Sequence, residues 1–147
     1  MIRHLLTLAI ITVAAAVAAS CSGNRLTSED LRDAELAIAD GDMTVARSVA
    51  DRLLGPTTMG TLSARDLARL SMVYMRMAED ENDNTALVAT AADLYRRAFK
   101  ENADSAMTYY QSLDASNEAL ASQLHHIVVA TDSAGVIPSD FHPDSIF

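Results

Sequence analysis

Cysteine, tryptophan, proline and glycine are all scarce in this chain. It has one cysteine, no tryptophan, three prolines and five glycines in 147 residues, and only 5% of the residues are aromatic. A single cysteine excludes a disulfide within one copy of the chain, so packing alone must stabilise the fold. Alanine, leucine and methionine, which favour helices, are abundant instead. The composition therefore predicts an all-α protein.

Positive charge is also in short supply. The chain has 11 basic and 20 acidic residues, which gives a net charge of −9. Neither nucleic acid nor an anionic membrane surface attracts a protein with this balance, so we expect no nucleic-acid partner. The sequence contains no Gly-x-Ser-x-Gly motif and no glycine-rich phosphate loop. We therefore expect a protein that is not an enzyme and uses no cofactor.

The one long apolar run lies at the N-terminus. Arg3 provides a positive start, residues 5–17 an apolar centre, and residues 18–20 are the small residues Ala-Ala-Ser directly before Cys21. This order is typical of a secretory signal peptide. The run is shorter than the stretch of about 20 apolar residues that a transmembrane helix needs. This shortness argues against a membrane-spanning helix, which remains one alternative. The other alternative is a plain secretory signal with a chance cysteine.

The position of Cys21 after small residues resembles the signal of bacterial lipoproteins. In that family a diacylglyceryl group is joined to the cysteine through a thioether, a dedicated peptidase cuts before it, and the new amine can receive a further acyl chain such as palmitate. The resemblance implies that residues 1–20 are removed and that Cys21 is lipidated. Ser22 stands where an Asp would imply the inner membrane, so the periplasmic side of the outer membrane is the expected location.

Removal of residues 1–20, which hold one basic and no acidic residue, leaves 127 residues with a net charge of −10. A chain of this length is long enough for one domain with its own core. We expect a lipidated tether over residues 21–26, a helical domain over residues 27–131 and an irregular tail over residues 132–147.

Hydrophobic residues in the expected domain recur every three or four positions, which places them on one face of a helix. Thr27 and Ser63, each with Asp three residues later, resemble capping boxes. The segment LGPTTMG, residues 54–60, is predicted to break the chain between helices. The pattern predicts six helices in three antiparallel pairs, which run from Thr27 to Gly41, from Asp42 to Leu54, from Ser63 to Ala78, from the end of an acidic loop at Asn84 to Lys100, from Ala103 to Leu113 and from Ser116 to Ala130.

The segment AIADGDMTVARSVADRLL resembles the centre of a tetratricopeptide repeat. In that family small residues let two helices approach and a Gly-Asp turn joins them, and Gly41, Asp42 and Ala46 match this frame. A similar spacing recurs 42 residues later, in the segment that begins at Val88. The resemblance covers roughly residues 31–99 and implies tetratricopeptide-like hairpins. A small right-handed helical bundle of another kind is the alternative.

The acidic loop DENDN, which begins at Asp80, resembles the start of an EF-hand calcium loop. Asp80, Asn82 and Asn84 occupy the first three ligand positions. Thr85 stands where the loop needs glycine, and Ala91 where it needs a bidentate glutamate. We therefore expect a solvated loop that caps the next helix rather than a calcium site.

The histidines do not form a metal-ligand pattern. His125 and His126 are adjacent on a predicted helix, so their side chains point about 100° apart and cannot readily share one metal. We expect one of them at the surface and the other packed at the edge of the core. His142 lies in the tail, and no metal site is predicted.

Methionine and tyrosine offer the best candidates for a binding surface. A group of methionines could line a plastic groove for a partner helix, although such residues more often fill a core; the group consists of Met72, Met75, Met77 and Met107. Tyr109 and Tyr110 lie beside an apolar face, where one of them could be presented to a partner. Packing at the edge of the core is the default expectation for both.

The tail GVIPSDFHPDSIF contains many apolar residues for a solvated segment. The large ones are Val136, Ile137, Phe141, Ile146 and Phe147. Two prolines prevent a continuing helix but suit an extended strap. We expect the tail to pack back across helix faces, with docking on a partner as the alternative.

Two hypotheses of function remain open. The first is a lipid-anchored helical scaffold on the periplasmic side of the membrane that binds a protein or peptide partner. The second is an envelope ligand-binding protein or hydrolase whose site residues are scattered in sequence. A concave groove lined by tyrosine and methionine would favour the first hypothesis, whereas two carboxylates buried together in a cleft would favour the second.

Overall fold

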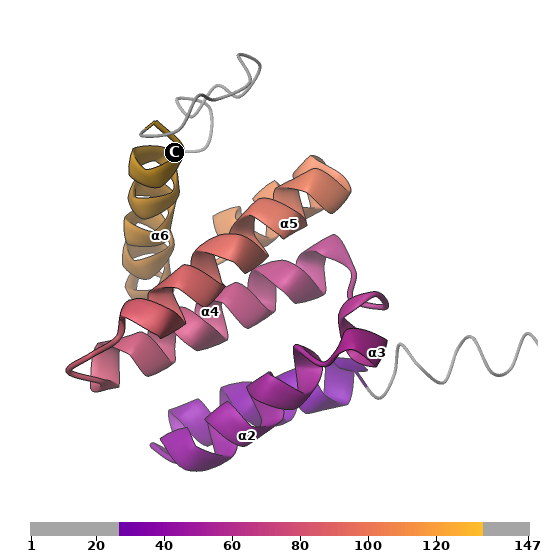
Figure 1. Ribbon diagram of the computed structural model, residues 1–147, viewed down its shortest axis with the longest axis vertical. Helices are drawn as coiled ribbons and strands as arrows, with labels where there is room; N and C mark the ends of the chain where they lie inside the picture. The colour runs from indigo at the N-terminus through magenta and orange to yellow at the C-terminus, as the bar shows by residue number, and fades with distance from the viewer. Residues whose placement is uncertain (1–26, 134–147) are drawn as a thin grey trace, which may run out of the picture.

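The computed structural model describes residues 27–133, which are all-α as the composition predicts. A helix over residues 27–39 is followed by α2 (Met43–Leu53), α3 (Pro56–Met59), α4 (Ala64–Asp80), α5 (Thr85–Gln111) and α6 (Ala115–Ser133), and this range contains no strand (Figure 1). No helix in this part of the chain is long and apolar enough to cross a membrane. The predicted signal peptide, Cys21, His142 and nearly all of the predicted tail lie outside the described residues.

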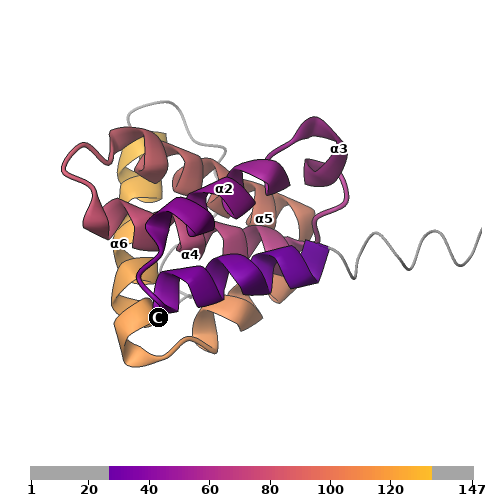
Figure 2. The same cartoon turned by 90° about the horizontal axis from the view of Figure 1, so that it is seen from below.

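The first hairpin consists of the helix over residues 27–39 and α2, which lie antiparallel in Figure 2. Gly41 turns the chain with a φ of +77°, a conformation that favours glycine. The side chain of Asp42 then accepts a hydrogen bond from the amide of Val45 and caps α2. Fully buried alanines, such as Ala34 and Ala46, let the two helices approach closely.

Helix α4 lies at the centre of the fold, where it packs against α2, α5 and α6. Ser63 and Asp66 form the predicted capping box at its start. Eleven of its 17 residues are buried, which is why the sequence of α4 is apolar on more than one face. Met72, Met75 and Met77 are buried here, which confirms that they fill the core, whereas Met107 of the same predicted group is only partly buried.

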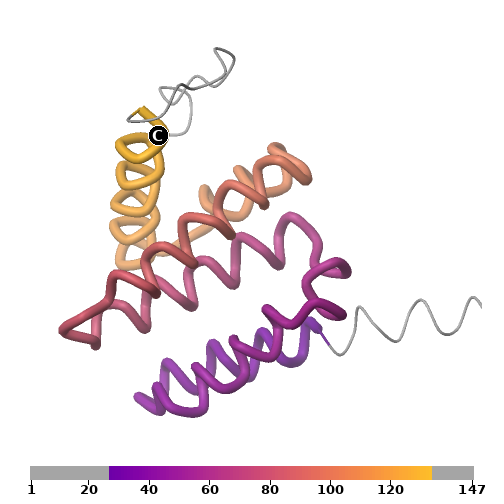
Figure 3. Tube along the Cα trace, in the orientation of Figure 1, coloured from indigo at the N-terminus to yellow at the C-terminus, as the bar shows by residue number. Residues whose placement is uncertain are grey.

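Helix α5 is two helical arms that meet at Asn102, whose φ and ψ of −162° and 103° are not helical. The rings of Tyr95 and Tyr110 are 5.1 Å apart, although 15 residues of straight helix would separate them by about 22 Å. The second arm must therefore fold back on the first, as the tube in Figure 3 shows. Asn102 caps the second arm by accepting a hydrogen bond from the amide of Ser105. The predicted separation of two helices near residue 102 is confirmed.

Helix α6 departs from the expected third antiparallel pair, since it crosses α4 and α5 steeply (Figures 1 and 2). Polar side chains at two places along α6 join it to α5. The hydroxyl of Tyr95 and Nδ1 of His125 share a hydrogen bond of 3.0 Å, and Arg96 donates to both Asp132 and Thr131. These contacts hold α6 at a steep angle to α4 and α5 rather than antiparallel to them.

The predicted break over residues 54–60 contains a short helix that the sequence analysis did not predict. Helix α3 is a single turn of four residues with Pro56 at its first position. Proline suits this position because the first helical residues need no amide partner within the helix. A single turn is too short for hydrophobic periodicity to reveal.

Candidate groove between the first hairpin and the central helix

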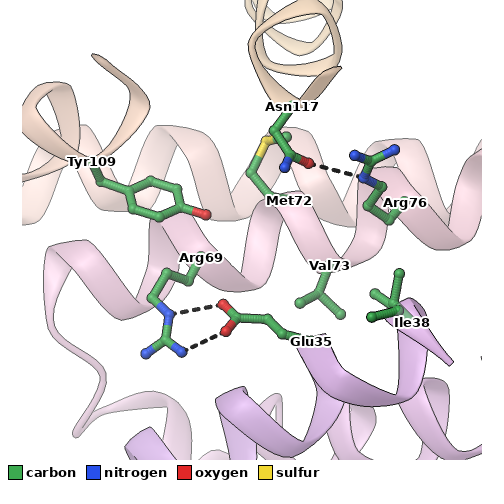
Figure 4. Close-up of a pocket in the computed structure, with 9 residues that line it drawn as sticks. Glu35, Ile38, Arg69, Met72, Val73, Arg76, Tyr109 and Asn117 are labelled. Atoms are coloured by element: carbon green, nitrogen blue, oxygen red, sulfur yellow. Dashed lines mark hydrogen bonds and ion pairs between the residues drawn. The ribbon is translucent and has the colours of Figure 1, made fainter. Parts of the chain in front are cut away.

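A hollow of about 300 Å³ lies where four elements meet: the helix over residues 27–39, α4, the second arm of α5 and the start of α6 (Figure 4). Its wall consists of Glu35, Ile38, Ala39, Arg69, Met72, Val73, Arg76, Tyr109 and Asn117. The α4 residues in this wall have the spacing i, i+3, i+4 and i+7, and those of the first helix have i, i+3 and i+4. Each set therefore forms one stripe along its helix.

The floor of the hollow is apolar. Met72 and Val73 belong to the core and are 4% and 2% exposed, and Ile38 packs partly buried against the same core. An apolar side chain that entered the hollow would therefore contact the hydrophobic core directly. Burial of such a side chain is worth about 1.5–3 kcal/mol when it is complete.

One rim of the hollow is held by Arg69 and Glu35. Nε and Nη2 of Arg69 donate to the two carboxylate oxygens of Glu35, at 2.9 and 2.8 Å. A second carboxylate, that of Asp66, lies 3.7 Å from Nη1 of Arg69. The hydrogen bond to Glu35 is the main cause that raises the pKa of the Arg69 guanidinium. This bidentate pair joins α4 to the first helix and fixes the width of the hollow at this point.

The other rim is held by Arg76, which joins α4 to α6. Nε of Arg76 donates to Oδ1 of Asn117 at 2.9 Å, and Nη2 donates to Oγ of Ser116 at 3.0 Å. The remaining nitrogen, Nη1, pairs with Glu79 at 3.0 Å. Glu79 therefore compensates the charge of Arg76, while the hydrogen bonds to Asn117 and Ser116 fix the position of its guanidinium.

Tyr109 borders the hollow with its ring and hydroxyl (Figure 4). Burial raises the pKa of this phenol to about 12, so the hydroxyl is protonated at neutral pH. Among residues 27–133 the hydroxyl has no hydrogen-bond partner. It is not among the buried polar atoms, so water can reach it. Tyr109 therefore offers a free donor and acceptor beside the apolar floor.

Two further hollows continue this one in opposite directions. A hollow of about 400 Å³ shares Ile38, Ala39 and Arg76 with the first and extends to Met43, Glu79 and Asp80. A hollow of about 500 Å³ shares Tyr109 and extends past Arg65 and Asp104 to Asn102, Ser105, Thr108 and Ser112. Shared walls make the three hollows neighbours. We call them together the groove, with an Asp80 end and an Arg65 end.

The loop over residues 80–84, which resembles the start of a calcium loop, is exposed, as expected of a solvated loop. No group of three or more His, Cys, Asp or Glu side chains that could hold a metal occurs between residues 27 and 133. Asn84, the last residue of the loop, is the N-cap of α5, as the predicted capping of the next helix requires, although its side chain makes no capping hydrogen bond. Its Nδ2 donates instead to the carbonyl of Ala78 at 2.9 Å. The side chain thus satisfies the end of α4 because the loop turns back on it.

The predicted candidate histidines and tyrosines differ in burial, and one of them, Tyr109, borders the groove. His125 is buried, and burial is the main cause that lowers its pKa, while His126 is exposed. Tyr110 is buried and contacts Ser71, whereas Tyr109 borders the groove. The sequence named both tyrosines as candidates, and the structure separates their roles.

Sequence reasoning missed the charged and polar rim. It did not single out Glu35, Arg69, Arg76 or Asn117, although the helical spacing of the first three with their apolar neighbours was visible. Asn117 lies 41 residues from Arg76 along the chain. No local pattern brings such a pair together, because their contact depends on how α6 crosses α4.

Comparison with known proteins found no matching family model, no matching curated protein and no matching solved structure.

Proposed function

We propose that this protein is a helical interaction module that binds a segment of a protein or peptide partner in the groove. We further propose that a lipid on Cys21 anchors the module to the periplasmic side of a bacterial outer membrane. The observation that carries the binding proposal is the groove itself, an apolar floor with three neighbouring hollows and polar rims. The order of residues in the first 21 positions supports the anchor.

The shape of the groove favours an elongated ligand. Three hollows with shared walls suit several successive side chains of one segment better than a single small molecule. Tyr109 and Met72 both contribute to the central wall, which is the composition expected of a partner-binding groove. Tyrosine combines a large contact area with a polar hydroxyl, and this makes it a frequent anchor at interfaces.

The hydrolase hypothesis has less support. The buried polar or charged residues between positions 27 and 133 are Thr27, Ser71 and His125, and none of them is a carboxylate. Ser71 shares its hydrogen bond with Tyr110, and His125 shares one with Tyr95. A nucleophile beside its base, or two carboxylates buried together in one cleft, would support hydrolysis. Glu79 and Asp80 do line one hollow, but both are exposed and Glu79 is paired with Arg76.

Site-specific photocrosslinking tests the binding proposal. A benzophenone amino acid replaces Ala39, which is exposed within the groove, and a control places it at Asp33, also exposed. Two residues before Glu35, Asp33 lies about 200° around the helix from it. We expect a discrete adduct from position 39 in cells that make the protein, and its loss when Ile38→Asp is added. Equal adducts from both positions, or none from position 39, would refute the proposal.

Mass spectrometry of the mature N-terminus tests the anchor. We expect a chain that begins at Cys21 and carries a diacylglyceryl thioether with an acylated amine. Cys21→Ser is expected to abolish the modification and to move the protein out of the membrane fraction, since two or three acyl chains anchor a protein much more firmly than one. An unmodified Cys21 or a retained Met1 would refute the anchor and leave the groove proposal untouched.

A further inference from the structure

The groove is closed to acidic ligands at its centre because both central arginines already have acidic partners. Arg69 is paired with Glu35 and lies near Asp66, and Arg76 is paired with Glu79. The Arg69 side chain is also only 17% exposed. A ligand carboxylate at this point would have to displace an internal partner, which would lose a charge-assisted hydrogen bond for each one formed.

The Asp80 end carries uncompensated negative charge. Asp80 is the last residue of α4, it is exposed, and it has no recorded hydrogen bond or ion pair among residues 27–133. The C-terminal end of a helix is itself partially negative, and the last turn of α4 holds no basic residue. The carboxylate of Asp80 is therefore repelled by the partial negative charge at the end of α4. A cation at this end of the groove would be attracted by both negative charges.

The charge of the rest of the protein favours the same partner. Residues 27–133 hold 18 acidic and 9 basic residues, a net charge of −9. Such a field attracts cationic partners and speeds their association. At the opposite end of the groove, the wall contains one basic and one acidic residue, Arg65 and Asp104. At the Asp80 end, Glu79 is paired with Arg76, which leaves the carboxylate of Asp80 as the unpaired charge in that wall.

We infer that the partner segment is basic and apolar: it places an aliphatic side chain over Met72 and Val73 and a Lys or Arg beside Asp80. This inference rests on the proposed function, because it assigns the chemistry of the ligand that the groove binds. It also accounts for an unfavourable interaction in the free protein, that of the Asp80 carboxylate with the negative C-terminal end of α4. A partner cation offsets that interaction only in the complex.

Three synthetic peptides of equal length test the inference by fluorescence anisotropy. One combines lysine with leucine, the second glutamate with leucine, and the third lysine with serine. Purified full-length protein in a non-ionic detergent is titrated, with detergent alone as the blank. We expect the lysine–leucine peptide to bind most tightly, and its binding to weaken as salt is raised. The other two peptides each lack one of the two required features.

Two matched substitutions connect the binding to Asp80. We expect Asp80→Asn to weaken the lysine–leucine peptide about two- to fivefold, as for one exposed ion pair, and to raise the melting temperature of the free protein slightly. Asp33→Asn makes the same change of net charge at an exposed position away from the groove, and should leave the affinity unchanged. An equal loss in both variants would overturn the inference, since it would reduce to overall charge.

Other outcomes separate this inference from the proposed function. Preference for the glutamate–leucine peptide, or no peptide binding, would overturn the inference, while an adduct from position 39 would still support the groove. A dimer in sedimentation that Ile38→Asp disrupts would assign the groove to a second copy. Peptide binding that starts only after deletion of residues 134–147 would assign it to the tail. Either result overturns the basic partner.

Discussion

The buried pair of Ser71 and Tyr110 leads to a prediction about Ser71→Ala. Its effect on the free energy of unfolding should change sign when Tyr110 is replaced by Phe. Oγ of Ser71 donates to the carbonyl of Ala68 at 2.7 Å, so its only proton is used within α4. The hydroxyl of Tyr110, 2.8 Å from the same Oγ, must then donate to it. Tyr110 is 2% exposed, so water cannot replace Ser71 as the acceptor. Loss of Ser71 would thus leave the Tyr110 hydroxyl without an acceptor, whereas loss of the Tyr110 hydroxyl would leave Ser71 bonded to Ala68.

The two single mutants remove the same bond at different cost. Tyr110→Phe leaves Ser71 with its partner at Ala68 and is expected to cost about 1 kcal/mol, the net value of one hydrogen bond. Ser71→Ala leaves a buried phenol without an acceptor, which costs about 2 kcal/mol. Alanine gains about 0.5 kcal/mol in helix propensity over serine. The expected net loss is about 1.5 kcal/mol, or a fall in melting temperature of roughly 6 °C.

The sign of Ser71→Ala should reverse when Tyr110 is already Phe. No phenol then needs an acceptor, so only the gain in helix propensity remains, and the second mutation should stabilise the protein by about 0.5 kcal/mol. Urea unfolding followed by circular dichroism gives all four free energies. If Ser71→Ala destabilises the Tyr110→Phe protein as much as it destabilises the wild type, the assigned direction of the hydrogen bond is wrong.

Three further predictions concern the turn, the buried histidine and the tail. Gly41→Ala should lower the free energy of unfolding by about 1–2 kcal/mol because φ is +77° there, whereas Gly60→Ala, at φ −73°, should leave it unchanged or raise it; equal melting temperatures would contradict this. Because burial lowers the pKa of His125, the unfolded chain binds the proton first as pH falls below about 6.5, so stability should fall there in the wild type and in His126→Gln but less in His125→Gln, as measured by urea unfolding at each pH. Deletion of residues 135–147 should lower the melting temperature if the tail packs on the helices; unchanged stability, with loss of a co-purifying protein, would favour docking.

Local signals were enough to place most of the helices. A capping box needs only Ser63 and Asp66, and the turn at Gly41 needs one residue with positive φ, so both are visible within a few positions of sequence. The break near Asn102 was predicted between a helix that ends at Lys100 and one that begins at Ala103, and basic residues near Lys100 suit the C-terminal end of a helix. Helix α3 was missed because a single turn carries no period.

The groove could be predicted only in part. Met72 and Tyr109 were recognised as residue types that suit a partner surface, but periodicity assigns a face to a helix and not the direction in which a neighbour crosses it. The crossing of α6 brings Asn117 to Arg76, and the hairpin brings Glu35 to Arg69 across 34 residues. Such pairs depend on the packing of whole helices, for which a single sequence holds no direct signal.

The central position of α4 has a consequence for how the protein opens. Helices α2, α5 and α6 all pack against α4, and eleven of its 17 residues are buried, so the amide protons in its middle should be among the slowest to exchange with solvent. The first hairpin lies at the edge of the bundle and contacts α4 through α2 and through the Glu35–Arg69 pair. It can therefore swing out as a unit while α4, α5 and α6 stay together, and hydrogen exchange should record faster opening in residues 27–53 than in residues 64–80. The wall that carries Glu35 and Ile38 would then be the moving one.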